Sequence, residues 1–357
     1  MQALPPGSTI GILGGGQLAR MLALAAARLG LKCHIFAPEH DSPGFHVSPA
    51  HLVAQYTDRS ALLEFAAEVD AITYEFENVP VEAVAFLEKL KPVRPGSKAL
   101  RVAQDRLKEK SLARELGALT AEFRSVTSLA ELKQAMNEIG LPAVLKTNRF
   151  GYDGKGQAKI MEAAQIEAAW AAMKDQPAIL ERFVNFQKEI SVICARGADG
   201  RFAAYEPVEN SHRNHILHTS TVPAAIDQAL AIEAVFVAQR MTEALDYVGV
   251  MGVEFFVGAD VLYVNEIAPR VHNSGHWTMD ACVVSQFEQH MRAVAGWPLG
   301  STYRHSDVVM TNLLGDELSH WQVLAAQPDV GLHLYGKREI RAGRKMGHFN
   351  KIRPRQA

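Results

Sequence analysis

Apolar and polar residues alternate in two different ways along the chain. In roughly the first hundred residues, short apolar runs take turns with longer amphipathic ones, which predicts a parallel sheet with helices on its faces. The predicted strands are 8–13, 32–36 and 71–74, and the predicted helices are 18–29 and 62–68. This pattern stops at KPVRPG (91–96), where two prolines and a glycine interrupt regular structure.

The second part of the chain has a different pattern. The stretch 98–116 is amphipathic, with Leu100 and Leu107 on one face and many charged residues on the other. Beyond residue 120 short apolar runs follow one another closely, which predicts antiparallel hairpins and an α+β domain. The predicted strands are 143–147, 157–160, 178–184, 189–195, 201–208, 250–257 and 261–267, and the predicted helices are 226–245 and 284–295. A small, more basic segment follows Trp297 and Pro298.

Length and composition place the chain among globular enzymes. It has 357 residues, enough for two or three domains, with 48% hydrophobic and 21% charged residues. The formal net charge is -2, so the chain as a whole does not attract nucleic acid or an anionic membrane. Any phosphate binding therefore depends on basic residues at particular places.

The cysteines and the N-terminal segment indicate a cytosolic protein. Cys33, Cys194 and Cys282 are far apart and have no metal-binding spacing, so we expect reduced and mostly buried thiols. The first residues, MQALPPGSTIGIL, lack the basic and then apolar pattern of a secretory signal. No apolar run reaches the length of about 18 residues that a membrane-spanning helix needs, so we expect no membrane span.

A glycine cluster lies between the first predicted strand and the helix after it. Gly14, Gly16 and Ala19 form a GxGxxA pattern, and Glu39 follows the next strand, as in dinucleotide-binding folds. A nicotinamide- or flavin-dependent enzyme is therefore one hypothesis. The glycines would equally let the helix begin close to the strand, or leave N–H groups at the helix N-terminus to bind a phosphate. The rest of the chain favours the phosphate hypothesis.

A second glycine-rich segment follows Lys146, which ends the apolar run PAVLK. Residues 151–157, GYDGKGQ, form a loop between two predicted strands. Glycines allow backbone N–H groups to approach phosphate oxygens, while lysines neutralise their charge. The loop is not a Walker A motif, because GKG leads into a strand and no Ser or Thr follows it. A lysine at a strand end is usually solvated, but the loop beside Lys146 favours a nucleotide site.

Two acidic residues lie within apolar strands, Glu254 in VMGVEFFV and Glu266 in VLYVNEIAP. A buried carboxylate is unfavourable unless it meets a cation or hydrogen-bond donors. The short turn between the strands lets both carboxylates face the same way, and Mg²⁺ takes one or two carboxylates together with nucleotide phosphates. Asn265 would add a neutral oxygen ligand. The alternative is that both carboxylates pair with structural arginines.

Polar residues follow this acidic strand directly, in PRVHNSGHW (269–277). Arg270 can hold a transferred phosphate or bicarbonate through two parallel hydrogen bonds. His272 or His276 alone would more often be structural, but together in this run they indicate a substrate pocket. Earlier in the chain, the backbone of residues 181–184 could bind an adenine edge and Glu189 the ribose hydroxyls. Ordinary charges on an edge strand are the alternative for that segment.

Seven motifs carry a resemblance that spans essentially the whole chain. They are GGGQLARML (14–22), TYEFENV (73–79), QDRLKEK (104–110), GYDGKGQ (151–157), YVGVMGVEFF (247–256), NEIAPRVHNSGHWT (265–278) and YGKREIRAGRKMGH (335–348). The chain closely resembles the ATP-grasp ligases, in particular the family of 5-(carboxyamino)imidazole ribonucleotide synthetases of bacterial and fungal purine biosynthesis. The resemblance implies an ATP-grasp fold in three parts. These are a Rossmann-like pre-ATP-grasp domain (1–105), an ATP-grasp domain (106–299) with a lid subdomain at about 120–185, and a small C-terminal substrate-binding domain (300–357).

The same resemblance implies roles for individual residues. The implied ATP-binding residues are Arg106, Lys146, Gly151, Tyr152, Asp153, Gly154, Lys155, Gly156, Gln157, Glu181, Arg182, Phe183, Val184, Glu189, His212, Asn265 and Glu266. Glu254 and Glu266 would bind Mg²⁺ or Mn²⁺. The 5-aminoimidazole ribonucleotide would contact Gln17, Glu75, Tyr152, Asp153, Asn273, Ser274, Lys337, Arg344 and Lys345.

The reaction of this family would begin when bicarbonate attacks the γ-phosphate of ATP and gives carboxyphosphate. The predicted catalytic residues are Asp153, Arg270 and His272. Arg270 would hold bicarbonate, and Asp153 or a lid-associated histidine would accept the proton of the amine. The loop 151–157 would exclude water from the labile intermediate.

The resemblance further implies a homodimer. Another ATP-grasp carboxylating or formylating ligase of purine synthesis is the nearer alternative. A dinucleotide-dependent oxidoreductase and a non-catalytic nucleotide-binding module are the more distant ones.

Overall fold

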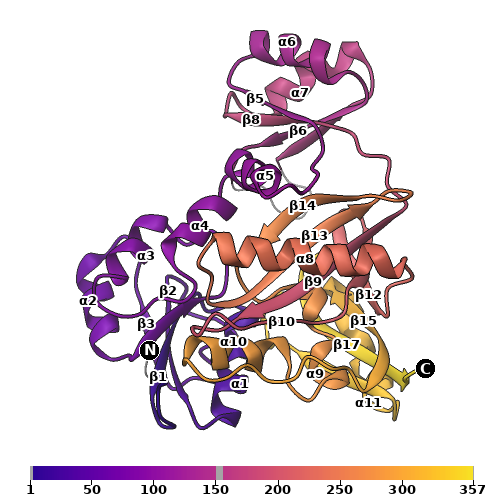
Figure 1. The fold of residues 1–357 in the computed structure, drawn as a ribbon. Helices are drawn as coiled ribbons and strands as arrows, with labels where there is room; N and C mark the ends of the chain where they lie inside the picture. The colour runs from indigo at the N-terminus through magenta and orange to yellow at the C-terminus, as the bar shows by residue number, and fades with distance from the viewer. Residues whose placement is uncertain (1–2, 150–155, 357) are drawn as a thin grey trace.

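The computed structural model describes residues 3–149 and 156–356, which form three sheets (Figure 1). The N-terminal sheet is parallel, with the strand order β3-β2-β1-β4. Its strands and helices are β1 (Thr9–Leu13), α1 (Gln17–Arg28), β2 (Lys32–Ala37), β3 (Ala50–Val53), α2 (Arg59–Ala67), β4 (Ala71–Tyr74), α3 (Val81–Leu87) and α4 (Ser97–Ala103). The predicted parallel sheet with helices is confirmed. Its central strands are buried on both faces, and such strands appear in a sequence as continuous apolar runs.

A small antiparallel sheet with the order β5-β8-β6-β7 lies at one end of the molecule (Figure 1). Its elements are β5 (Phe123–Val126), α6 (Leu129–Ile139), β6 (Ala143–Thr147), β7 (Gln157–Ile160), the 3₁₀ turn η1 (Ala163–Gln165), α7 (Ile166–Ala172) and β8 (Ala178–Arg182). Both helices cover the sheet through a core that includes Met136, Leu145 and Trp170. Neither helix follows from the hydrophobic pattern described above, although Ser128 caps α6 by accepting a hydrogen bond from the N–H of Glu131.

The central sheet has nine strands in the order β14-β13-β9-β11-β12-β15-β17-β16, with β10 paired to β9. Its strands are β9 (Lys188–Arg196), β10 (Phe202–Ala204), β11 (Val208–Arg213), β12 (Ile216–Val222), β13 (Gly249–Val257), β14 (Leu262–Ala268), β15 (Ser306–Leu314), β16 (Val330–Leu334) and β17 (Lys345–Pro354). The helices and turns around it are α5 (Arg106–Glu115), α8 (Gln228–Ala244), η2 (Asn273–Gly275), α9 (Thr278–Ala281), α10 (Gln286–Val294), η3 (Gly315–His320) and α11 (Trp321–Ala325). The C-terminal strands continue this sheet through the pair β12–β15.

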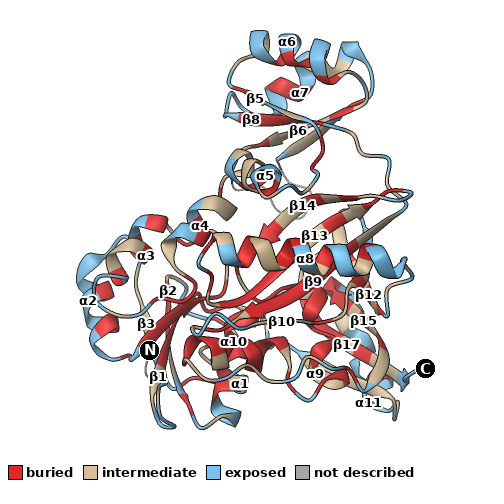
Figure 2. Cartoon of the chain, in the orientation of Figure 1, coloured by how far each residue is buried: buried red, intermediate tan, exposed pale blue. Residues whose placement is uncertain are grey.

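Alternate residues of β9 belong to two different hydrophobic cores. Val192 and Cys194 pack with α8, whereas Ile193 packs on the opposite face with α1 and α10. Figure 2 shows buried residues gathered around these strands and helices. Because one core includes residues of both β1 and β9, the N-terminal sheet is joined to the central sheet by continuous apolar packing.

Three local expectations need correction. The amphipathic stretch 98–116 forms two helices, because Asp105 caps α5 by accepting hydrogen bonds from the N–H groups of Leu107 and Lys108. Glu109 and Lys110, expected on its charged face, are buried. The strand predicted at 201–208 is interrupted after β10, and β11 begins at its end.

The three thiols are free and two of them are buried. Cys194 and Cys282 are buried and Cys33 is partly exposed, and none of these thiols is in a disulfide. Within residues 3–149 and 156–356, every helix is too short or too polar to cross a lipid bilayer.

Candidate active site

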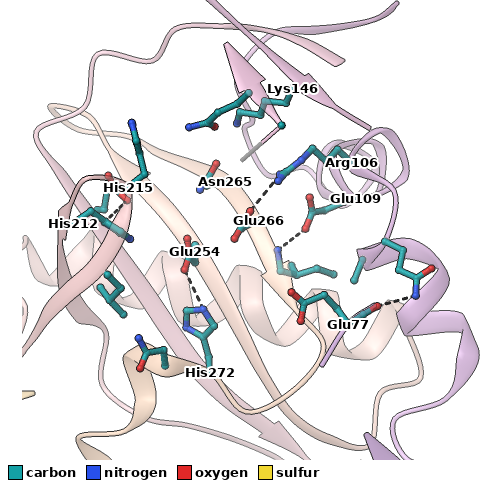
Figure 3. Close-up of a pocket in the computed structure, with 18 of the residues that line it drawn as sticks. Glu77, Arg106, Glu109, Lys146, His212, His215, Glu254, Asn265, Glu266 and His272 are labelled. Atoms are coloured by element: carbon teal, nitrogen blue, oxygen red, sulfur yellow. Dashed lines mark hydrogen bonds and ion pairs between the residues drawn. The ribbon is translucent and has the colours of Figure 1, made fainter. Parts of the chain in front are cut away.

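A cavity of about 970 Å³ lies among elements that belong to all three sheets. Its wall takes residues from the turn after β4, from α5, from β6 and β8, and from β9, β11, β13 and β14. Figure 3 shows acidic, basic and imidazole side chains from these elements pointing into the same space.

Glu254 and Glu266 are directly paired on the neighbouring strands β13 and β14, and both line the cavity. Directly opposed residues share one face of a sheet, so the structure brings these two carboxylates together as the strand pattern predicts. Glu254 Oε1 lies 3.3 Å from His272 Nε2, and Glu266 Oε2 lies 3.3 Å from Arg106 Nη1 (Figure 3). Burial, with the nearby Glu266 carboxylate, raises the pKa of Glu254 to about 8.

This donor set fits Mg²⁺ that is shared with a nucleotide. Asn265 also lines the cavity, so two carboxylates and one amide oxygen are available. Among the described residues, no group of three or more His, Cys, Asp or Glu side chains is placed to hold a metal alone. Mg²⁺ usually binds one or two carboxylates and completes its shell with phosphates and water, which this arrangement leaves room for. Arg106 brings one positive charge to these two neighbouring acids, and the raised pKa of Glu254 is consistent with room for a further cation.

Lys146 is held at the cavity by a buried carboxylate. Its Nζ lies 2.8 Å from Oε2 of Glu181 on β8, and Lys110 Nζ lies 3.7 Å from the other oxygen of Glu181. Burial acts to raise the pKa of Glu181, but the ammonium groups of Lys110 and Lys146 outweigh it and hold the pKa at about 2. Glu181 therefore stays ionised and fixes the position of Lys146.

Arg270 is anchored to the N-terminal domain. Its Nε donates a hydrogen bond to the carboxylate of Glu77, and its Nη1 donates to the carbonyl of Val271 at 3.0 Å. Burial acts to raise the pKa of Glu77, but the guanidinium group of Arg270 holds it at about 2. Glu77 and Arg270 both line the cavity, so their ion pair places one negative and one positive charge in its wall.

Aromatic side chains line the part of the cavity near the predicted base-binding segment. Phe186 and Phe256 stack with ring centroids 4.5 Å apart, and Phe183 lies in the same wall. The backbone N–H of Phe183 already donates to Pro142. Glu189 lies 3.1 Å from Nδ1 of His212.

The glycine-rich loop after Lys146 falls mainly outside the described residues, and this holds for Gly151, Tyr152, Asp153, Gly154 and Lys155. The predicted roles of these five residues stay predictions. Gly156 and Gln157 are described, and both line the cavity. Gln157 begins β7 and pairs with Lys146 across the hairpin.

The first glycine cluster is occupied by the protein itself. Glu75, directly after β4, accepts hydrogen bonds from the N–H groups of Gly16 and, at 2.8 Å, of Ala19. Gly14 has φ +104, and a Cβ there would lie 2.8 Å from Oε1 of Glu75. These N–H groups at the start of α1 are therefore not available to a phosphate. The carboxylate of Glu75 beside the glycines argues against a dinucleotide at this turn, and the phosphate hypothesis stays a prediction.

Apart from Tyr152 and Asp153, which lie outside the described residues, the predicted substrate residues divide into two groups. Gln17, Glu75, Asn273 and Lys345 line the cavity, and both amide atoms of Asn273 are buried without a partner among the described residues. The others are absent from the cavity wall: Ser274, Lys337 and Arg344.

The reasons differ for these three residues. Ser274 is fully buried and its hydroxyl lies 2.8 Å from Nδ1 of His272. Lys337 donates to the carbonyl of Lys345 at 2.8 Å, and Arg344 donates to the carbonyl of Glu339 at 2.8 Å.

Several residues of the cavity are missed by sequence reasoning. Glu77, Glu109 and the two stacked phenylalanines line it, and Lys110 lies behind Glu181. Glu109 accepts a hydrogen bond from the N–H of Ile267 at 2.5 Å, and burial, with Glu266 nearby, raises its pKa to about 8. The motifs TYEFENV and QDRLKEK contain Glu77, Glu109 and Lys110, but helical periodicity alone assigns such charges to a solvated face.

The fold and the site together define the class of protein, the ATP-grasp proteins. Three family models match consecutive parts of the chain. They are the ribonucleotide synthetase preATP-grasp domain at residues 7–104, the ATP-grasp domain at 111–287, and the phosphoribosylaminoimidazole carboxylase C-terminal domain at 308–357.

Full-length relatives narrow this class. The N5-carboxyaminoimidazole ribonucleotide synthase of Brucella melitensis is 51% identical, over 99% of this chain and 98% of the relative. The protein of the same name from Bacillus subtilis is 44% identical, over 98% and 92%. The chain belongs to the family of N5-carboxyaminoimidazole ribonucleotide synthases. The family resemblance of the sequence motifs is thereby confirmed.

Solved structures agree with this assignment. The ADP complex of an N5-carboxyaminoimidazole ribonucleotide synthetase matches with a TM-score of 0.96 and 42% identity, over 99% of this chain and 94% of that one. The Aspergillus clavatus N5-carboxyaminoimidazole synthase in complex with ADP and 5-aminoimidazole ribonucleotide matches with a TM-score of 0.92 and 30% identity, over 98% and 94%. The predicted ATP-grasp fold with an N-terminal pre-ATP-grasp domain and a C-terminal domain is confirmed.

Proposed function

We propose that this chain is an ATP-dependent carbon–nitrogen ligase of purine biosynthesis. It joins bicarbonate to the amine of 5-aminoimidazole ribonucleotide and gives N5-carboxyaminoimidazole ribonucleotide, ADP and phosphate. The observation that carries the proposal is the carboxylate pair Glu254 and Glu266, which faces Lys146 and Arg106 across one cavity. The identity of the acceptor, 5-aminoimidazole ribonucleotide, is inferred from family membership over nearly the whole chain.

The nucleotide phosphates lie between the basic residues and the carboxylate pair. Mg²⁺, when bound with ATP at Glu254 and Glu266, offsets the charge of the transferring phosphoryl group. The guanidinium group of Arg106 lies 3.3 Å from the carboxylate of Glu266, so it would add a positive charge beside the phosphates. Lys146, held by an ionised Glu181, adds a fixed positive charge.

The adenosine part occupies the aromatic side of the cavity. The base packs near Phe183 and the stacked pair Phe186 and Phe256. Since the N–H of Phe183 donates to Pro142, the base takes its hydrogen bonds from Val184 and the carbonyl groups of 181–183. Glu189 binds the ribose hydroxyls, with His212 beside it.

The acceptor lies on the opposite side, between the N-terminal domain and η2. Asn273 supports this placement, because its two buried amide atoms have no partner among the described residues and line the cavity. Gln17, Glu75 and Lys345 complete this side. Burial, with Arg344 nearby, lowers the pKa of Lys337 to about 8, and we assign Lys337 and Arg344 to the ribose phosphate through movement of the segment 337–344.

The chemistry has two stages. Bicarbonate, held by Arg270, attacks the γ-phosphate of ATP and forms carboxyphosphate and ADP. The amine of the aminoimidazole then takes the carboxyl group, directly or as released CO₂, and phosphate leaves. Asp153 accepts the amine proton in this scheme, and the loop 151–157 excludes water during transfer.

We further propose domain limits, location and assembly. The domains span 1–105, 106–299 and 300–357, with support from the matched ranges of the three family models. The enzyme acts in the cytoplasm as a homodimer, on the strength of family resemblance, and sedimentation at several concentrations tests the assembly.

Phosphate release from ATP tests the function. We expect release to require bicarbonate and 5-aminoimidazole ribonucleotide together, with one phosphate per carboxylated product. Other purine intermediates that carry a free amine serve as matched acceptors and should give only background release. Equal release with one of those acceptors would favour another ATP-grasp ligase of the pathway. Bound NAD without ATP turnover would favour an oxidoreductase.

A further inference from the structure

A row of hydrogen-bonded polar side chains crosses part of the central sheet and leads to Glu254. Ser220 on β12 pairs with Asn210 on β11, and Ser191 on β9 pairs with Glu254 on β13. Ser191, Asn210 and Ser220 are buried, as is Ser274 in η2. Buried polar groups are unfavourable unless each one finds a partner. The hydrogen bonds along this row therefore fix which atom of each side chain donates and which accepts.

Each hydrogen bond in the row has a direction. The backbone N–H of Ser274 can only donate, and it points at Nδ1 of His272 at 3.4 Å. Nδ1 therefore carries a lone pair and no proton, and the hydroxyl of Ser274, at 2.8 Å, also donates to it. A hydroxyl has one proton, so Ser274 must accept from Ser191, 2.5 Å away.

The remaining members obey the same direction. Ser191 receives a hydrogen bond from Nδ2 of Asn210 at 2.9 Å. The carbonyl oxygen of Asn210 in turn accepts from the hydroxyl of Ser220 at 2.8 Å. Every donor in the row points toward His272, so the protonation site of the ring follows from the hydrogen-bond network.

With Nδ1 occupied as an acceptor, the neutral ring carries its proton on Nε2. That atom lies 3.3 Å from Oε1 of Glu254 (Figure 3). His272 packs closely over the backbone of Gly252, where an added Cβ would lie 2.8 Å from Cβ of His272. Both ring nitrogens are thus engaged, one with a serine and one with a carboxylate.

We propose that this buried row fixes His272 as the Nε2–H tautomer, and that the neutral ring positions Glu254. His272 is then a positioning residue, and it does not accept the proton of the substrate amine. The contact at 3.3 Å holds one oxygen of Glu254, whose side chain lines the cavity. Partners of this kind orient metal-binding carboxylates in proteins. The role of Glu254 as a cation ligand rests on the proposed function, whereas the tautomer does not.

The tautomer is measured on the full-length protein without metal, labelled with ¹⁵N at histidine. We expect Nε2 of His272 to resonate as a protonated nitrogen and Nδ1 as an unprotonated one, with His272→Gln used to assign the signals. Ser274→Ala should shift the Nδ1 signal of His272. Ser48→Ala is the matched control, because it removes another buried serine hydroxyl, one that bonds Cys33 and Ala50, and should leave His272 unchanged. A proton on Nδ1 in the unsubstituted protein would overturn the proposal.

Two substitutions of His272 separate positioning from proton transfer. The side-chain N–H of glutamine reaches the place of Nε2, whereas that of asparagine ends near Nδ1. We expect His272→Gln to keep the calorimetric affinity for MgADP within a few fold, and His272→Asn to lose about ten- to a hundredfold. Turnover should follow the same order. Loss of turnover in both variants with unchanged MgADP affinity would make His272 a catalytic residue and refute the positioning role.

These readouts do not depend on the identity of the acceptor. A protein that shows the Nε2–H tautomer but does not carboxylate 5-aminoimidazole ribonucleotide would contradict the proposed function alone.

Discussion

Two regions of this molecule contain glycine-rich sequence patterns but differ in the charges that the structure places there. The turn after β1 has its helix N–H groups filled by Glu75, a carboxylate of the same chain. The cavity beside Lys146 instead gathers carboxylates and cations from three sheets around about 970 Å³ of open space.

The difference lies in where the charges find their partners. At the first turn, the carboxylate of Glu75 already accepts from two N–H groups at the start of α1, those of Gly16 and Ala19. At the cavity, Glu254 and Glu266 face each other on adjacent strands, an arrangement that is stable only with a shared proton or a cation. A glycine pattern in the sequence indicates only a particular backbone conformation. The kind of ligand is indicated by the charged side chains that the fold brings together.

The largest effect is expected at the carboxylate pair. Glu266→Gln should lower phosphate release at least about a thousandfold, because the amide cannot offset the charge of a cation. The thermal midpoint should stay near that of the unsubstituted protein, since Glu266 is partly exposed. Glu39→Gln is the matched control, because Glu39 is the exposed acid that a dinucleotide fold would use. If Glu39→Gln lowered phosphate release and Glu266→Gln did not, the first glycine turn and not the carboxylate cavity would be the nucleotide site.

A second substitution tests the anchor of Arg270. Glu77→Gln leaves the guanidinium group without its charged partner, so Arg270 should lose its fixed orientation. We expect turnover to fall about a hundredfold, with a higher bicarbonate concentration needed for half-maximal rate. Glu122→Gln removes the exposed partner of Arg182 and should change neither quantity. If Glu77→Gln had the same dependence on bicarbonate concentration as the unsubstituted protein, the proposal that Arg270 binds bicarbonate would be wrong.

The raised pKa of Glu254 predicts that nucleotide binding at the cavity depends on pH. Below about pH 8 its carboxyl group holds a proton that a cation must displace, and above that pH the carboxylate is already free. The affinity for MgADP should therefore fall about fivefold from pH 8 to pH 7 and level off above about pH 9. Calorimetry of Glu254→Gln should show weaker binding without this slope. A pH-independent affinity in the unsubstituted protein would contradict the assignment.

The smallest effect is expected at the first turn itself. Gly14→Ala should lower the free energy of unfolding by about 1–3 kcal/mol, because φ is +104 and the new Cβ meets Glu75. Gly7→Ala is the matched control, with φ +92 and no atom within 4 Å of the new Cβ. Chemical denaturation should rank Gly14→Ala as the more damaging change. Equal losses would mean that the contact with Glu75 is not important.

The sequence predicts the sheets and the family well, because these depend on continuous apolar runs and on motifs. The strands 143–147 and 157–160 agree with β6 and β7 at both ends. The pairing of Glu254 with Glu266 also follows from two strands and a short turn.

The remaining site contacts depend on tertiary packing. Glu77 reaches Arg270 across 193 positions of the chain, which no local pattern reports. Glu109 and Lys110 are buried on a helix that looks amphipathic, because they contact the backbone of β14. Ser274 is predicted to touch substrate but lies behind His272, since its neighbours in space come from β9.

The central claim is that nucleotide binds at the carboxylate cavity and not at the first glycine turn. Calorimetric titration with MgADP of the unsubstituted protein, Lys146→Met and Gly14→Ala tests this most directly. We predict one site in the unsubstituted protein and in Gly14→Ala with similar affinity, and a loss of at least about tenfold in Lys146→Met. Unchanged binding in Lys146→Met together with lost binding in Gly14→Ala would contradict it.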